Sequence, residues 1–344
     1  MSGIDYIGLD VHKKTVAYCV KTADGRIKDE GSVAATRQAL TDWADGLDGP
    51  WLGAMEATLF TGWIYDHLQP HAVDLKVAHS LMLRAIVVSK KKNDRIDARK
   101  IADLLRCDLL PECYIAPPQI RELRRALRFR NLLMRQTVRM KNRISGFLME
   151  VGGEYTKSKL HGKRYFAELL ESLDDVPESV VELLQMSRGA LEMLQSMQRE
   201  LIDGLREHPV LERRVDRLMT IPGVGIVTAL TWALEVGDPE RLPSVGRAIS
   251  YCGLCSAQNS SAGKERRGPI SKQRNSHLQR VLIEAAKLAP RYNPQLAVVH
   301  ERELARGNRN RATIAVARKM VAYLLAVDKR QTAFEPTMAP SIAA

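Results

Sequence analysis

Four acidic residues occupy positions from which they could hold a divalent metal ion. Asp10 ends an apolar segment typical of a buried strand, and Glu56 lies inside another. Asp94 and Asp97 are spaced i, i+3 at the start of a predicted helix, so they share one face. Carboxylates that met at one end of a sheet would repel one another unless a cation neutralised them. Mg²⁺ prefers such oxygen ligands, and metal ions held in this way can clamp the oxygens of a phosphoryl transfer.

Ordinary structural roles explain one of these pairs better than the other. Asp94 and Asp97 are equally well explained as capping residues that favour the positive end of the helix dipole. Asp10 and Glu56 are harder to explain, because an unpaired acid on a buried apolar strand is costly.

A hydroxyl-rich segment next to positive charge is the second candidate for chemistry. Ser260 and Ser261 are followed by a basic run, whose members are Lys264, Arg266, Arg267, Lys272, Arg274 and Arg280. A serine that attacks a phosphodiester needs such cations to stabilise the charge that develops. A solvated polar loop is the alternative, and it is the commoner role of serine in such a segment.

A long amphipathic helix is predicted from Ile120 to Leu148. One face carries an apolar stripe, and another gathers seven arginines: Arg121, Arg124, Arg125, Arg128, Arg135, Arg139 and Arg143. This number exceeds what solubility requires. We expect this face to hold the phosphate backbones of RNA or DNA.

The elements that must position these residues change along the chain. Strands are predicted at Tyr6–His12, Lys14–Lys21, after the Asp24-Gly25 turn, at Trp51–Ala57 and at Asp74–Ala78, with helices at Thr36–Gly46 and Thr61–Leu68. A three-stranded meander followed by alternating elements suits a mixed α/β sheet flanked by helices. Pro111, Pro117 and Pro118 then mark a domain boundary.

Helices dominate beyond this boundary. A second long helix is predicted from Val180 to Leu205, and its leucine spacing fits either the seam of a coiled coil or a hairpin with the arginine-rich helix. The segment from Ile221 to Gly225 is either a turn that grips a DNA phosphate or a plain interhelical turn. Cys252 and Cys255 form a lone CxxC, which fits packing better than a zinc or redox site.

Composition narrows the class of protein. The 344 residues are 45% hydrophobic, enough for two or three domains, and 52 basic against 40 acidic residues give a net charge of +12. Such basicity is typical of nucleic-acid binding, although acidic proteins or a membrane surface are alternatives. No apolar run approaches the roughly 18 residues of a membrane span, no signal peptide is recognisable, and the five cysteines are scattered. We therefore expect a cytoplasmic, nucleoid-associated protein with no membrane partner.

Five motifs in order resemble one family over roughly Tyr6 to Val327. They are Gly8-Leu9-Asp10-Val11-His12-Lys13, Met55-Glu56-Ala57-Thr58, Lys92-Asn93-Asp94-Arg95-Ile96-Asp97-Ala98-Arg99-Lys100-Ile101-Ala102, Ile221-Pro222-Gly223-Val224-Gly225, and Tyr251-Cys252-Gly253-Leu254 to Gly268-Pro269-Ile270-Ser271-Lys272. The chain resembles the insertion sequence 110 family of DEDD transposases, which are relatives of the pilin-gene invertases.

The resemblance, taken together with the helices and loops predicted from the residues, implies a division of the chain into four parts. Residues 1–115 would form a RuvC-like domain of ribonuclease-H fold, in which Asp10, Glu56, Asp94 and Asp97 hold Mg²⁺. Residues 116–208 would form a helical, coiled-coil linker, residues 209–330 a mostly helical transposase domain, and residues 331–344 a disordered tail. The catalytic serine of the family lies eight residues after the motif glycine, at Ser261. Many relatives read Ser-Gly there, whereas this chain reads Ser260-Ser261-Ala262-Gly263, so Ser260 stays a second candidate.

The resemblance also implies an activity and partners. Members use a structured bridge RNA that pairs with donor and target DNA, and they act as tetramers, or dimers of dimers, with composite active sites. We therefore expect RNA-guided, site-specific DNA strand exchange through a covalent phosphoserine. The predicted nucleic-acid-binding residues are Arg121, Arg124, Arg125, Arg128, Arg135, Arg139, Lys264, Arg266, Arg267, Lys272 and Arg274. The alternatives are a junction-resolving nuclease that uses metal-activated water, and a non-catalytic RNA- or DNA-binding protein.

Overall fold

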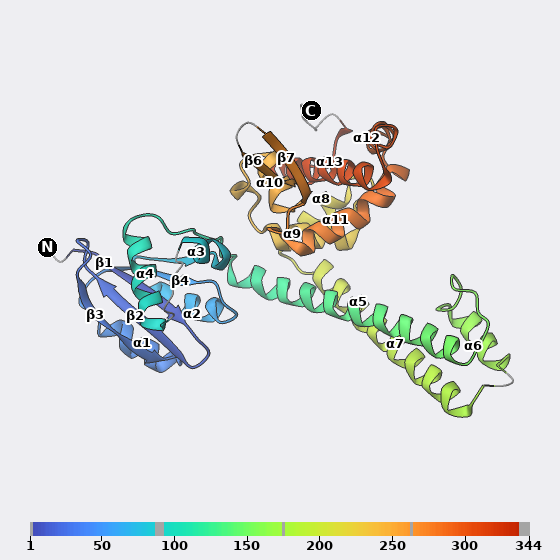
Figure 1. Ribbon diagram of the computed structural model, residues 1–344, viewed down its shortest axis with the longest axis horizontal. Coiled ribbons are helices and arrows are strands. Elements are labelled where there is room, and N and C mark those ends of the chain that lie inside the picture. The colour runs from blue at the N-terminus through green and yellow to red at the C-terminus, as the bar shows by residue number, and fades with distance from the viewer. Residues whose placement is uncertain (1–2, 87–92, 174–175, 262–263, 337–344) are drawn as a thin grey trace. The chain divides into compact units, whose positions relative to one another are not determined.

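A computed structural model describes residues 3–86, 93–173, 176–261 and 264–336, and the side chains of residues 259–267 lie outside this description. The chain forms two compact units, Met1–Pro118 and Gln119–Ala344, each considered by itself. Their helices and strands are drawn in Figure 1. The described residues also include three short 3₁₀ helices: η1 (Gln69–His71), η2 (Pro239–Arg241) and η3 (Ala289–Arg291).

A five-stranded mixed sheet forms the centre of the N-terminal unit. β1 (Asp5–Val11), β2 (Thr15–Lys21) and β3 (Ile27–Ala34) form an antiparallel meander, and β4 (Trp51–Glu56) and β5 (Asp74–Ala78) continue the sheet parallel to β1. The strand order is β3-β2-β1-β4-β5. The predicted mixed sheet is therefore confirmed.

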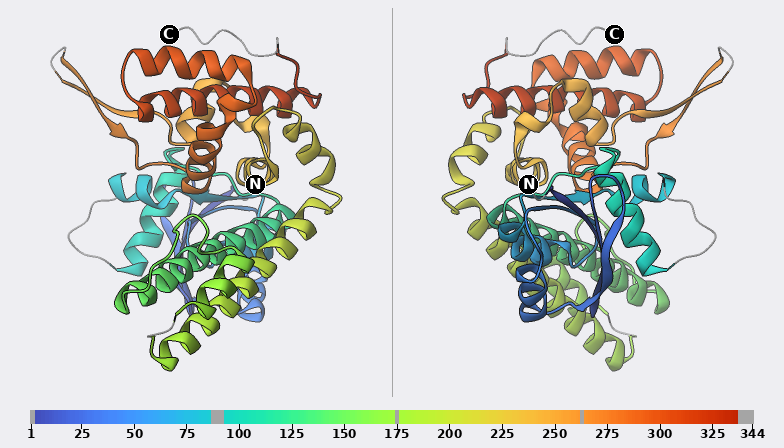
Figure 2. Two further views of the ribbon diagram at one scale, coloured as in Figure 1. Left: turned by 90° about the vertical axis from the view of Figure 1, so that its right-hand side faces the viewer. Right: turned by 90° about the vertical axis from the view of Figure 1, so that its left-hand side faces the viewer.

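Helices cover both faces of this sheet, as the right-hand view of Figure 2 shows. On one face, α1 (Arg37–Asp45) and α2 (Thr61–Leu68) bury Leu40 and Ile64 against Leu9 and its neighbours. On the other, α3 (Ser80–Ile86) and α4 (Asp94–Arg106) bury Leu83 and Ile101 against alanines of β4 and β5. Alternate strand residues thus serve two separate cores, as the period of two requires.

Two long helices extend through the C-terminal unit. α5 (Pro118–Glu150) and α7 (Glu178–Arg206) are joined through α6 (Lys163–Glu171), and Ile144 and Leu148 pack in one cluster with Leu184 and Leu191. The buried Gln198 amide donates a hydrogen bond of 2.8 Å to the Thr137 hydroxyl. The leucine seam of α7 is therefore used within the chain, as the hairpin alternative predicted.

The remaining helices form a second core in this unit. It is built from α8 (Glu212–Met219), α9 (Ile226–Val236), α10 (Val245–Tyr251), α11 (Ser276–Leu288), α12 (Pro294–Ala305) and α13 (Arg309–Arg330). α9 is buried on almost every side, and its Trp232 indole N–H donates to Asp328, which also accepts two hydrogen bonds from Arg214. Asp328 can be buried in this apolar core because these hydrogen bonds offset the cost of removing its carboxylate from water.

A two-stranded hairpin corrects the expectation of a polar loop around Ser260. β6 (Ser256–Ser261) pairs antiparallel with β7 (Lys264–Ile270), with Ser261 opposite Lys264. Its polar sequence has no apolar alternation to indicate a strand, and backbone pairing alone defines it. No described helix is long and apolar enough to cross a membrane.

Candidate functional site

Strand register brings the first two predicted acids side by side. Leu9 of β1 is paired with Met55 of the parallel β4, so the next residues, Asp10 and Glu56, are neighbours at the carboxyl ends of the two strands. Gly8 and Ala54 lie on the face of the sheet that α4 covers. Asp10 and Glu56 follow them by two residues, the spacing that returns a side chain to the same face of a strand. The sequence therefore directs both carboxyl groups to the face that α4 covers.

The start of α4 is placed over this edge by a close contact with β1. A Cβ on Gly8 would lie 2.0 Å from the carbonyl oxygen of Ala98 and 2.5 Å from the nitrogen of Ala102. Only a glycine lets the helix backbone approach the strand so closely. Because Asp94 and Asp97 are in the first turn of α4, this contact sets their distance from β1.

Ion pairs fix the helix across the meander. Arg99 donates two hydrogen bonds to Glu30 of β3, at 2.6 and 2.5 Å, and Lys21 of β2 pairs with Asp103 at 2.6 Å. The Asn93 side chain caps the helix by accepting from the Arg95 N–H. Since Asn93 is the cap, Asp94 and Asp97 are not needed for capping, although their charges still favour the helix dipole.

A cluster of three side chains results. Oxygen or nitrogen atoms of Asp10, His12 and Asp94 all lie within 4.8 Å of one another, and this is the one such cluster among the residues described. His12 Nε2 lies 3.2 Å from an Asp10 oxygen and 3.4 Å from an Asp94 oxygen. Glu56 and Asp97 are not members of the cluster, so their predicted role as ligands stays a prediction.

His12 was not among the predicted site residues. It follows Asp10 by two residues at the end of β1, which is the spacing that returns a side chain to the same face of a strand. This spacing was the available signal. The motif Asp10-Val11-His12 could therefore have indicated a paired carboxylate and imidazole.

The electrostatics of Asp10 favour a bound cation. Burial raises the pKa of its carboxyl, and the charges of Asp94 and Asp97 raise it further, whereas His12 lowers it. A carboxylate that is desolvated and repelled by two others is stabilised by a neighbouring positive charge. The carboxylate oxygens fit a hard divalent cation, and His12 offers a further ligand or a hydrogen-bond partner for Asp10.

The base of the serine hairpin is the second part of the site. Asn275 donates its N–H to the Tyr251 carbonyl and Ser271 donates to that of Cys255, each at 3.0 Å. Gly253 has a φ of +67°, and a Cβ there would lie 2.3 Å from the Cβ of Arg274. The glycine of the Tyr-Cys-Gly-Leu motif is thus needed for both conformation and space, because it lets β6 begin beside the end of β7.

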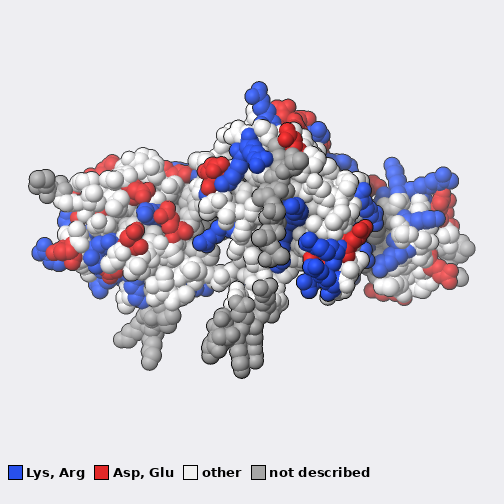
Figure 3. Space-filling model, turned by 90° about the horizontal axis from the view of Figure 1, so that it is seen from above, with Lys and Arg blue, Asp and Glu red and all other residues white. Residues whose placement is uncertain are grey.

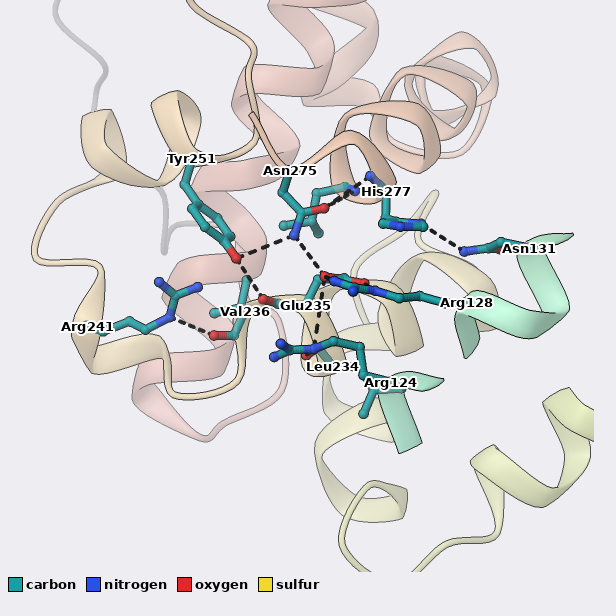
Figure 4. A network of polar contacts seen from close by, with 11 residues as sticks. Arg124, Arg128, Asn131, Leu234, Glu235, Val236, Arg241, Tyr251, Asn275 and His277 are labelled. Carbon is teal, nitrogen blue, oxygen red and sulfur yellow. Dashed lines mark hydrogen bonds and ion pairs between the residues drawn. The ribbon is translucent and has the colours of Figure 1, made fainter. Parts of the chain in front are cut away.

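A buried carboxylate links this base to α5 (Figure 4). Glu235 accepts two hydrogen bonds of 2.8 Å from Arg128 and a third of 2.8 Å from the Asn275 amide. The Tyr251 hydroxyl donates to the Glu235 carbonyl at 2.9 Å, and Arg124 donates to the Leu234 carbonyl at 2.8 Å. Glu235 therefore joins α5, α9, α10 and α11, a role with no signal in its apolar sequence neighbourhood.

This network divides the predicted arginine face. Arg124 and Arg128 are engaged within the protein, so replacing them would test folding as well as nucleic-acid binding. Arg125, Arg135 and Arg139 are exposed on α5, and Arg121 is half-buried. Figure 3 shows Lys and Arg side chains in clusters on one face, with Asp and Glu among them. The predicted nucleic-acid roles of these residues stay predictions.

Several predicted residues are described only in part. Ser260, Ser261, Lys264, Arg266 and Arg267 lie in the paired strands, but their side chains are outside the described residues. Lys272 and Arg274 follow β7 and are exposed. Burial raises the pKa of the Cys252 thiol to about 12, which fits the expected packing role rather than metal binding.

Comparison with known proteins identifies the chain. Residues 215–301 match a model described as "Transposase IS116/IS110/IS902 family", and residues 7–152 match a model for DEDD transposases of the IS110 type. A transposase for insertion sequence element IS1328 from Yersinia enterocolitica is 27% identical over 83% of this chain and 86% of its own length. The transposase for IS1111A from Coxiella burnetii is 26% identical over 72% of this chain and 69% of its own length.

The matched regions contain both the acidic cluster and the serine hairpin, and they define the chain as a transposase, an enzyme class that acts on DNA. It belongs to the IS110 family. A DEDD transposase domain implies acidic residues that bind divalent metal ions, in keeping with the cluster of Asp10, His12 and Asp94.

Proposed function

We propose that this transposase cuts and exchanges DNA strands by a serine recombinase mechanism supported by Mg²⁺. The observation that carries the proposal is the acidic cluster at the carboxyl end of β1, where Asp10 and Asp94 meet below the first turn of α4. The strand order and helices of the N-terminal unit suit a RuvC-like, ribonuclease-H fold. The proposed place of action is the nucleoid in the cytoplasm.

Asp10, Asp94, Asp97 and Glu56 would hold the metal ion. Bound there, Mg²⁺ would neutralise charge on the reacting phosphate and assist ionisation of a hydroxyl. His12 hydrogen-bonds to Asp10 and would fix the orientation of that ligand.

Ser261 is the proposed nucleophile. Its Oγ would attack a DNA phosphorus, so that an Oγ–P bond forms and the P–O3′ bond breaks. The hydroxyl proton leaves to a base, and the departing 3′ oxygen takes up a proton. The resulting 5′-phosphoserine keeps the energy of the broken bond, and attack by the 3′ hydroxyl of another strand would release the serine without ATP.

Guide RNA and assembly are further parts of the proposal. A structured bridge RNA would select donor and target DNA, with the exposed arginines of α5 and the basic β7 segment binding phosphates. A tetramer would let the acidic cluster of one protomer act with the serine of another. If such an RNA is transcribed from the DNA that flanks the gene, omitting it should abolish recombination but not binding to non-specific DNA.

The nucleophile is tested by trapping the covalent adduct. On a DNA substrate whose second strand exchange is blocked, denaturing electrophoresis should show a protein–DNA band that withstands detergent and disappears with protease. Ser261→Ala should lose this band and all recombination. Ser260→Ala is the matched control, because moving the hydroxyl by one residue shifts it several ångströms from the reacting phosphate.

The outcomes separate the alternatives. If Ser260→Ala abolishes the adduct and Ser261→Ala does not, the neighbouring serine is the nucleophile. If the double variant still cuts DNA, water is the nucleophile and the chain acts as a nuclease.

The metal ligands are tested by Asp97→Asn, which should abolish recombination. If this variant cuts DNA at the wild-type rate, the assignment of Asp97 as a metal ligand fails.

A further inference from the structure

A large cavity lies within the C-terminal unit, between α5, α9 and α11. Its volume is about 980 Å³, and apolar side chains such as Met134, Val138, Val281 and Leu288 line much of it. Tyr292, an exposed aromatic residue, also lines it. The position of α5 at this wall is fixed by the pairing of Arg128 with Glu235 and by a 3.3 Å contact between Asn131 and His277.

Four arginines line the same cavity: Arg130, Arg135, Arg139 and Arg280. In the part of the chain that the structure describes, none of them pairs with a carboxylate, in contrast with Arg124 and Arg128 on the same helix. The buried Nε of Arg130 has no hydrogen-bond partner among the described residues. Within the described chain, Arg130 is half-buried and has only a 3.3 Å hydrogen bond to the neighbouring Asn131, whereas Arg135, Arg139 and Arg280 are exposed at the rim. A partly buried guanidinium without a carboxylate, beside three further unpaired cations, favours an anionic ligand.

Among the described residues that line this cavity, the one carboxylate does not neutralise the arginines. Glu284 lines the wall but pairs with Lys287 at 2.7 Å. His277 responds to the excess positive charge: burial lowers its pKa, Glu235 opposes this, and the charges of Arg128, Arg280 and Arg135 lower it further. The cavity therefore combines positive potential with an apolar floor.

We propose that this cavity binds an unstacked nucleotide of single-stranded DNA or RNA, with its phosphate against the arginines and its base on the apolar floor and Tyr292. The inference rests on the proposed function, since it names the ligand of a surface that faces nucleic acid. A free phosphate would leave the apolar floor unused, and a duplex keeps its bases stacked outside a concave pocket. Arginine, an aromatic face and apolar walls together are typical of single-strand recognition.

Gly225 offers a matched pair of variants. It lines the cavity, a Cβ there would meet nothing within 4 Å, and its backbone (φ −92°, ψ 172°) is one that any residue can adopt. It is also the N-cap of α9, where Asp and Asn both stabilise a helix. Gly225→Asp adds a negative charge to the cavity, and Gly225→Asn adds nearly the same shape without it.

The test uses the full chain carrying Ser261→Ala, which cannot form the adduct, so that binding is measured independently of catalysis. The probe is an oligonucleotide with one 2-aminopurine, as single-stranded DNA, as single-stranded RNA and as a duplex, followed by anisotropy and by the fluorescence of the unstacked base. Gly225→Asp and the double variant Arg135→Gln/Arg139→Gln should each weaken single-strand binding about tenfold or more and abolish the fluorescence gain. Gly225→Asn and the exposed Arg213→Gln should bind within about twofold of the parent.

Comparing the affinities for the single-stranded DNA probe and the single-stranded RNA probe shows which nucleic acid supplies the nucleotide. Unchanged single-strand binding by Gly225→Asp would overturn the proposal, as would an equal loss of duplex binding. Loss of self-association in Gly225→Asp without any change in oligonucleotide binding would assign the cavity to an acidic protein segment instead. If the cavity variants behave as expected and no serine adduct is ever trapped, the proposed chemistry fails and the nucleotide site stands.

Discussion

Asp10 shows at the residue scale how function opposes stability. Its carboxyl is buried at the end of β1 and repelled by Asp94 and Asp97, so that the folded chain holds a charge it would more stably lack. The buried Glu235 and the ion-paired Glu30 are each matched by arginines, whereas, among the described residues, Asp10 has only the His12 imidazole, which does not offset its burial and the neighbouring negative charges. The unbalanced position of Asp10 is what a metal ligand requires.

We expect Asp10→Asn to raise the melting temperature of the metal-free protein, because it removes a repelled charge while nearly keeping the shape. Strand cleavage should fall about 10³-fold or more, since the metal supplies several kcal/mol of charge stabilisation. Scanning calorimetry with and without Mg²⁺ measures the melting temperatures, and a strand-cleavage assay measures the loss of activity. Mg²⁺ should raise the melting temperature of the wild type more than that of the variant. A variant that is less stable without metal would show that Asp10 serves the fold.

Glu235 is the contrasting case of a fully paired buried carboxylate. Burial by itself raises its pKa, but hydrogen bonds from Arg128 and Asn275, together with the arginine charges, outweigh this and lower the pKa below its ordinary value of 4.5. Its ion pair therefore stabilises the fold above the unfolded pKa, and this stability is lost as the pH falls through the lower, folded value.

Glu235→Gln should reduce the free energy of unfolding at pH 7 by about 3 kcal/mol, because it leaves Arg128 without its bidentate partner. Urea denaturation from neutral to acid pH is the measurement. The difference from wild type should shrink as the pH falls below the ordinary glutamate pKa. Glu284→Gln removes only a surface pair and should cost well under about 1 kcal/mol. A difference that grew on acidification would contradict the sign of the shift.

At the scale of elements, the position of α4 on β1 determines whether the acids meet. Gly8→Ala would force a methyl group into the backbone of α4 at Ala98 and Ala102. We expect a loss of about 3 kcal/mol, at the upper end of overpacking, and cleavage lowered at least as much as by Asp10→Asn. Gly146→Ala in α5, where a Cβ meets nothing within 4 Å, should be neutral or slightly stabilising. Equal stabilities of the two variants, measured by thermal unfolding, would exclude the close contact.

Elements were predictable where burial imposes a period on the sequence. The strand at Asp74–Ala78 and the strand beginning at Trp51 were found because apolar residues meet a core on one or both faces. The β6–β7 hairpin was missed because its residues are polar and its pairing is a property of the backbone. The four candidate acids of the N-terminal unit were found by residue type. His12 was missed although its spacing from Asp10 was a signal, whereas its contact with Asp94 and the pairing of Glu235 with Arg128 are set only by the tertiary fold.

The same limit applies to the arginines of α5. A helical wheel groups them by angle and cannot say which part of that face other helices cover. Glu235 is more than a hundred residues away in sequence from the two arginines that it pairs with. Long-range pairing of this kind gives Arg124 and Arg128 a structural role, whereas Arg135 and Arg139 of the same predicted surface line the cavity.

At the scale of the whole molecule, the cores of the two units share no residue among those described. The two clusters that flank the sheet end at Ile115, and those of the helical unit begin at Ile120. Each unit therefore has its own apolar interior, which is the physical condition for independent folding. All members of the acidic cluster lie in the first unit.

We expect a fragment ending at Pro118 to fold alone and to keep the metal site. It should unfold in one cooperative thermal transition, since a single sheet holds both of its apolar layers. Mg²⁺ should raise its melting temperature, and Asp10→Asn should reduce that rise, as in the full chain. The fragment should cut no DNA, because the proposed serine lies in the other unit. Circular dichroism melts with and without Mg²⁺ provide the measurement. A fragment that melts without cooperativity would mean that the helical unit is needed to form the cluster, and a fragment that cuts DNA would make the acidic residues sufficient and remove the need for the serine.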